Sequence, residues 1–105
     1  MGASNISQVI YGKTLADAYN NACQEATYEH GHDSYNGTIS TTRGVKLVQP
    51  TQKQITDKYL RAFQNASWDR TEKWGHVEAL ALPHKYYKGR GHGVRAWLVC
   101  GWAAE

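Results

Sequence analysis

Hydrophobic and polar positions along this chain of 105 residues follow two periods. Apolar residues recur at helical spacing after Thr14 and again after Thr51, while β-branched and aromatic residues dominate short runs elsewhere. The pattern predicts two helices and four to five strands in a single domain over residues 1–105. The expected strands are residues 6–11, 38–42, 45–49, 76–82 and 94–102, with a tight turn at Arg43-Gly44 and a polar link over 67–75.

Capping residues mark both predicted helices. Thr14 precedes the first apolar stripe and Asp17 follows three residues later, which is a box-like helix start, and Gly31 is a natural C-cap. Thr51 and Gln54 have the same spacing before the second helix. The element order predicts an α+β fold with two helices packed on one face of a mostly antiparallel four- to five-stranded sheet, a ferredoxin-like arrangement being one option.

The last predicted strand has two partly apolar faces. Leu98 and Trp102 share one face by parity, and Trp97 and Val99 share the other. Such a strand is central in its sheet, or it is an edge that meets a partner. Trp, Tyr and Arg are also the residues typical of protein–protein contacts, so a protein-binding inhibitor is one possible class.

Charge is unevenly distributed. The net charge is +3, yet residues 1–36 carry one Lys against four acids, and residues 79–104 carry no acid. Glycines alternate with basic and aromatic residues in the last third, a composition suited to phosphate or single-stranded nucleic acid. The alternative is a loop made soluble by its charges. The candidate contact residues are Lys85, Tyr86, Tyr87, Lys88, Arg90, His92 and Arg95, and Arg43, Lys46, Arg61 and Arg70 could extend the patch.

A second candidate site is the polar corner after the first helix. His30, His32 and Asp33 could hold a divalent ion or perform acid–base chemistry, with His76, His84 or His92 as further ligands. In a binding role, His32, Asp33, Tyr35 and Asn36 would form a second, polar rim of the contact surface. The alternative is structural, with His30 capping the helix and Asp33 stabilising a turn.

The sequence also indicates a location. It has no apolar run long enough for a membrane span, and its N-terminus has neither the basic nor the apolar part of a signal peptide. We therefore expect a cytoplasmic protein that contacts no membrane. Cys23 and Cys100 lie in apolar settings, where buried free thiols are expected in a reducing compartment.

Two stretches resemble small open reading frames of bacteriophages and mobile elements. They are the run Gly31-His32-Asp33-Ser34-Tyr35-Asn36-Gly37-Thr38-Ile39-Ser40 and the helix start Lys13-Thr14-Leu15-Ala16-Asp17-Ala18-Tyr19. Small phage proteins of this kind include anti-defence inhibitors, among them the anti-CRISPR proteins. The resemblance implies binding of a host defence effector or its nucleotide signal, without catalysis.

The combined prediction is a non-enzymatic binding protein without a cofactor, acting in the host cytoplasm. Its expected partner is an anionic surface: a nucleic acid, a nucleotide, or the nucleic-acid-binding face of a host effector. The alternative is a small metal-dependent or His/Asp hydrolytic enzyme that uses the corner at His30, His32 and Asp33. A homodimer is compatible with the sequence but not required by it.

Overall fold

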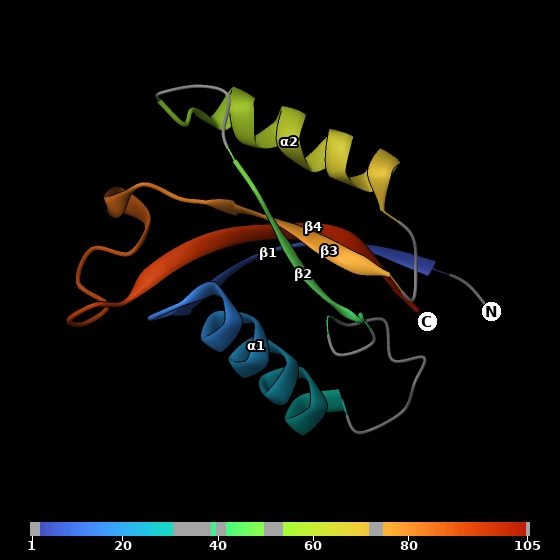
Figure 1. The fold of residues 1–105 in the computed structure, drawn as a ribbon, viewed down its shortest axis with the longest axis horizontal. Coiled ribbons are helices and arrows are strands. Elements are labelled where there is room, and N and C mark those ends of the chain that lie inside the picture. The colour runs from blue at the N-terminus through green and yellow to red at the C-terminus, as the bar shows by residue number, and fades with distance from the viewer. Residues whose placement is uncertain (1–2, 31–38, 40–41, 50–53, 72–74, 105) are drawn as a thin grey trace.

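The computed structural model of the chain describes residues 3–30, 39, 42–49, 54–71 and 75–104. These residues have an α+β fold, with two helices and a mostly antiparallel sheet of four strands (Figure 1). The predicted fold class is therefore confirmed. The elements are β1 (Ala3–Gly12), α1 (Leu15–His30), β2 (Gly44–Val48), α2 (Asp57–Arg70), β3 (His76–Ala81), a short 3₁₀ helix η2 (His84–Tyr86) and β4 (Arg95–Ala104).

The strand order is β1-β4-β3-β2, so β4 is an interior strand, and β1 and β2 are the edges. β4 pairs antiparallel with β1 along its whole length and antiparallel with β3 on its other side. β2 runs parallel to β3. A parallel pair needs a crossover connection, and α2 lies in the connection between β2 and β3.

Both faces of β4 are buried, and each is covered by a different helix. Trp97 and Val99 share one hydrophobic cluster with Ala18 of α1. Leu98 shares a second cluster with Phe63 of α2. Because successive residues of a strand point to opposite faces, α1 and α2 cover opposite sides of the sheet, as Figure 1 shows. The prediction of both helices on one face, including its ferredoxin-like option, was wrong, and the layers are helix, sheet and helix.

The first helix begins as the capping pattern predicts. The Thr14 Oγ1 accepts a hydrogen bond from the Asp17 N–H at 3.1 Å, and the Thr14 carbonyl accepts one from the Ala18 N–H at 2.9 Å. Thr14 thereby satisfies an amide that the first turn leaves without a partner. The predicted C-cap, Gly31, lies outside the described residues.

The second helix begins later than predicted. Thr56 is its N-cap, and the Thr56 Oγ1 accepts a hydrogen bond from the Tyr59 N–H at 3.2 Å. Ile55 before the cap and Leu60 in the first turn both pack against the α2-side cluster, as in a hydrophobic staple. The predicted cap Thr51 lies outside the described residues, and Gln54 precedes the helix.

Three further predictions between the helices and strands need correction. Gly44 is the first residue of β2, and the Arg43 N–H donates to the Gly75 carbonyl at 3.0 Å, so these two residues continue toward β3 and form no tight turn. In the expected strand 38–42, the Thr42 N–H donates to the Ile39 carbonyl at 3.0 Å, which is a turn bond, and residues 38, 40 and 41 lie outside the description. The predicted polar link over 67–75 begins inside α2, which continues to Arg70.

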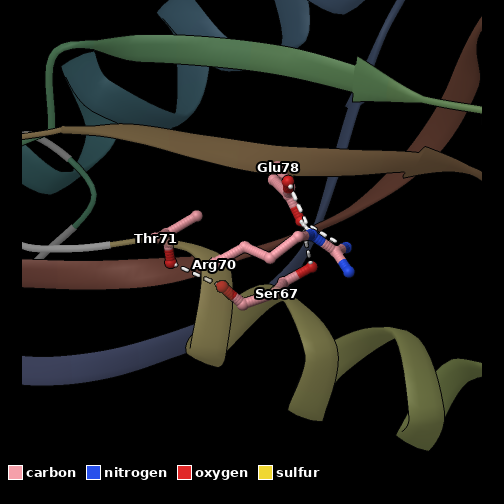
Figure 2. A network of polar contacts seen from close by, with 4 residues as sticks. All are labelled: Ser67, Arg70, Thr71 and Glu78. Carbon is pink, nitrogen blue, oxygen red and sulfur yellow. Dashed lines mark hydrogen bonds and ion pairs between the residues drawn. The ribbon is translucent and has the colours of Figure 1, made fainter.

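Glu78 is a charged residue of β3 that is only 8% exposed. Its carboxylate accepts hydrogen bonds from the Ser67 hydroxyl at 2.8 Å and from the Arg70 Nε and Nη2 at 3.0 and 2.6 Å (Figure 2). Burial alone would raise the pKa of Glu78, but the hydrogen bonds from Arg70 and Ser67 and the Arg70 charge hold it below its ordinary value. The ionised carboxylate therefore joins the last turns of α2 to the sheet.

Two indoles add further links from the same end of α2. The Trp68 Nε1 donates to the Ile6 carbonyl of β1 at 3.0 Å. The Trp102 Nε1 of β4 donates to the Trp68 carbonyl at 2.8 Å. These bonds reach from α2 to β1 and β4, so the end of the helix is fixed to three strands when Glu78 of β3 is included.

We expect Gly101→Ala to lower the free energy of unfolding by about 1–3 kcal/mol. A Cβ at Gly101 would lie 2.7 Å from the Val77 Cγ1 and 3.2 Å from the Val77 Cα, and Val77 is fully buried. Gly44→Ala is the matched control, because the three atoms nearest to its Cβ all belong to the exposed His76 imidazole, the nearest at 2.8 Å, and this side chain can turn away. Urea unfolding of both variants measures the difference, and equal losses would contradict this account of the packing.

We expect Glu78→Gln to lower the free energy of unfolding by about 1–3 kcal/mol at neutral pH. The substitution removes the charge-assisted hydrogen bonds to Arg70, whose side chain is half exposed. The pKa of Glu78 is lowered in the folded state, so its ionised carboxylate stabilises the fold. This stabilisation is fully present above the pKa of an unfolded Glu and is lost as pH falls through the folded-state pKa. The wild-type free energy of unfolding should therefore fall more steeply than that of Glu78→Gln as pH falls below about 4.3. Glu25→Gln, which removes an exposed carboxylate on α1, is the control for the loss of one negative charge and should be more stable than Glu78→Gln at neutral pH.

Candidate functional site

The predicted contact residues lie mainly in the connection between β3 and β4. We call residues 85–95 the basic loop; it includes the last two residues of η2 and ends on the first residue of β4. Two turn bonds shape its start, from the Tyr86 N–H to the Pro83 carbonyl and from the Tyr87 N–H to the His84 carbonyl, both at 3.0 Å. The loop therefore leaves the sheet through a defined 3₁₀ turn.

The two tyrosines of the loop are half-buried. Tyr86 and Tyr87 both pack against the α2-side cluster. The His84 imidazole meets the Tyr87 ring edge-on at 5.1 Å between centroids, and the Lys85 Nζ lies 5.2 Å from the centre of the Tyr86 ring. The rings thus anchor the loop to the core, and the cations provide most of its exposed contact groups.

The basic side chains of the loop are exposed. Within the described parts of the chain, no carboxylate lies within ion-pair distance of any of them. Their charge is therefore available to a ligand and is not neutralised by a neighbour. The residues are Lys85, Lys88, Arg90, His92 and Arg95.

Three glycines of the loop have backbone conformations that other residues rarely adopt. Gly89, Gly91 and Gly93 have φ angles of 83°, 129° and 78°. A Cβ at Gly89 or Gly93 would meet no atom within 4 Å, so backbone conformation and not crowding favours glycine there. Among the described residues, no backbone acceptor bonds the amides of these three glycines or of His92. Free amides in such a turn form anion-binding concavities.

Arg90 connects the loop to β1. Its guanidinium carbon lies 3.8 Å from the centre of the Tyr11 ring, which is a close cation–π contact. Two adjoining hollows meet at this pair and run between β1 and α1. Asp17 and Glu25 line the α1 side of these hollows, so the groove carries charges of both signs, whereas the loop is purely basic.

A separate hollow of about 350 Å³ lies within the loop itself. Two imidazoles, His84 and His92, line it together with Arg95 and the backbone of Gly91 and Gly93. The structure thus brings three of the predicted contact residues, Tyr87, His92 and Arg95, to one concave surface beside the free amides. This is the most anion-compatible part of the described surface.

The polar corner cannot be compared with the structure in the same way. His32, Asp33, Tyr35 and Asn36 lie outside the described residues, and His30 is the last residue of α1. Over 3–30, 39, 42–49, 54–71 and 75–104, no three His, Cys, Asp or Glu residues form a group able to hold a metal ion. The metal and acid–base readings of the corner remain predictions.

The remaining predicted residues are dispersed. His76 begins β3, whereas His84 and His92 follow its other end. Arg43 precedes β2 and Lys46 lies on it, at the far edge of the sheet from β1. Arg70 already binds Glu78, so the basic loop is not extended through these positions.

Sequence patterns did not indicate the groove beside β1. Its strand-side residue Tyr11 lies within the predicted strand over residues 6–11 and was not a candidate contact residue. The available signal was the pairing of the two chain ends: β1 and β4 are antiparallel partners, with Tyr11 opposite Ala96, which brings Tyr11 close to the loop that precedes β4.

No protein-family model, curated protein or solved structure matches this chain. Neither described helix has the length and apolar character needed to cross a membrane.

Proposed function

We propose that the protein is a non-enzymatic binding protein whose basic loop contacts the phosphate groups of a nucleic acid. The observation that carries the proposal is the exposure of the loop cations without carboxylate partners beside free glycine amides. Cations attract phosphate at a distance, and amides in a glycine turn bind its oxygens closely. Because the cations are spread from Lys85 to Arg95, they suit several phosphates along a strand better than one.

Electrostatics ranks the three ligands that the sequence suggested. The nucleic-acid-binding face of a host effector is itself positive, so it would repel the basic loop. A nucleotide signal offers few phosphates and would engage only part of the loop. A nucleic-acid strand presents a phosphate at every step and engages all of it.

The resemblance to phage anti-defence proteins suggests why such a protein would bind nucleic acid. A protein that binds nucleic acid through a small loop could withhold it from a host effector, or mask the strand that the effector recognises. The support is chemical: the loop has the charge and backbone that such a ligand needs.

The double variant Lys88→Ala with Arg90→Ala should weaken binding of a fluorescein-labelled single-stranded oligonucleotide by about 10- to 100-fold at low salt. Loss of two phosphate contacts should also reduce the slope of log K against log salt by about 1.5. Fluorescence anisotropy over a salt series measures both quantities.

The matched control is Arg43→Ala with Lys46→Ala, which removes the same charge at the opposite edge of the sheet. It should keep most of the wild-type affinity. An equal loss in both double variants would show unspecific attraction to net charge, and wild-type binding that is independent of salt would contradict the proposal.

A further inference from the structure

Among the described residues, no strand pairs with the outer side of β1. The Ala96 carbonyl of β4 accepts a hydrogen bond from the Leu82 N–H, so the backbone groups of Ala96 point toward β3. Because these groups alternate in direction along a strand, the even-numbered residues of β4 bond toward β3 and the odd-numbered residues bond toward β1. Since Ile10 opposes Trp97, the even-numbered residues of β1 bond to β4. The outward N–H and C=O groups therefore belong to odd-numbered residues, and no partner bonds them within the described parts of the chain. They are Ala3, Asn5, Ser7, Val9 and Tyr11.

β1 also lacks the features that normally protect an edge strand. It has ten residues, without charge or proline, and its register with β4 runs without a bulge from Ala3 to Gly12. The opposite edge, β2, is five residues long and carries Lys46. Natural sheets prevent edge pairing with short strands, charges, prolines and bulges, so β1 is the edge that is left open.

A groove of about 670 Å³ runs beside this edge, between β1 and one side of α1. At its α1 side, Tyr28 is 92% exposed, which is unusual for so large an aromatic ring. Val9 is the other exposed apolar residue along the groove, at 36%. The groove provides space in which a further strand could lie against β1.

We propose that a second copy of this chain occupies the groove, with its β1 antiparallel to the first about a two-fold axis at Ser7. This register joins all the outward residues: Ser7 meets Ser7 of the second copy, Asn5 meets Val9, and Ala3 meets Tyr11. In a two-fold pair, a charge near the axis meets its own copy, and β1 has no charge to be repelled. The two sheets then form one continuous sheet across the dimer.

Val9→Pro tests this interface without breaking the sheet of one copy. The Val9 N–H points outward, so proline removes only the donor that the second copy would use, and proline is tolerated at such edge positions. Sedimentation equilibrium over about a hundredfold range of concentration should show a dimer for the wild type. Val9→Pro should weaken dimerisation by about 30-fold or more, because each copy loses one hydrogen bond.

Val9→Thr keeps the N–H and is the matched control, and it should dimerise as the wild type does. Ser7→Lys is a second, independent variant: its exposed side chain would place two like charges at the axis, and it should give monomers with a wild-type circular dichroism spectrum. A wild type that stays monomeric at every concentration would overturn the proposal. So would dimers of unchanged affinity in both Val9→Pro and Ser7→Lys.

Discussion

The architecture depends on one constraint: β4 is apolar on both faces and must be buried on both. A strand of this kind cannot lie in a two-layer fold, because one of its faces would be exposed to water. With two helices available, each has to cover one side, and α1 and α2 are separated accordingly. The close approach of β3 and β4 at Gly101 and Val77 shows how little space the shared interior leaves.

The network around Glu78 explains how α2 is held in one orientation. An apolar stripe alone lets a helix slide or rotate on a sheet, because hydrophobic contact has little direction. A buried carboxylate is costly without partners, so the position of Glu78 requires Ser67 and Arg70 to lie beside it. The other end of α2 packs in the cluster that also holds Tyr86 and Tyr87, so the helix that Glu78 orients also supports the basic loop.

Local patterns predicted the elements well and the layers poorly. The cap at Thr14, the strand over 76–82 and the alternation of the last strand are confirmed by the structure. The start of α2 was misplaced because Thr51 and Thr56 both suit an N-cap, and only the packing of Ile55 and Leu60 distinguishes them. The basic loop was found from charge and glycine content, which are local. The groove beside β1 was not, since it joins the two ends of the chain and depends on strand order.

The basic loop and the open edge of β1 meet at Arg90 and Tyr11. In an antiparallel pair centred on Ser7, each Tyr11 lies opposite Ala3 of the other copy, so the two Tyr11 residues are eight residues apart along the joined strands, or ~27 Å. The two basic loops would then stand at opposite ends of the interface. Two weak phosphate-binding loops at a fixed separation bind one nucleic-acid strand far more tightly than either loop alone, because the second contact is intramolecular. In the proposed dimer, the uncharged edge of β1 would act as a rigid spacer between two basic loops that each bind weakly. On this basis, a domain with a small binding surface can hold a long ligand.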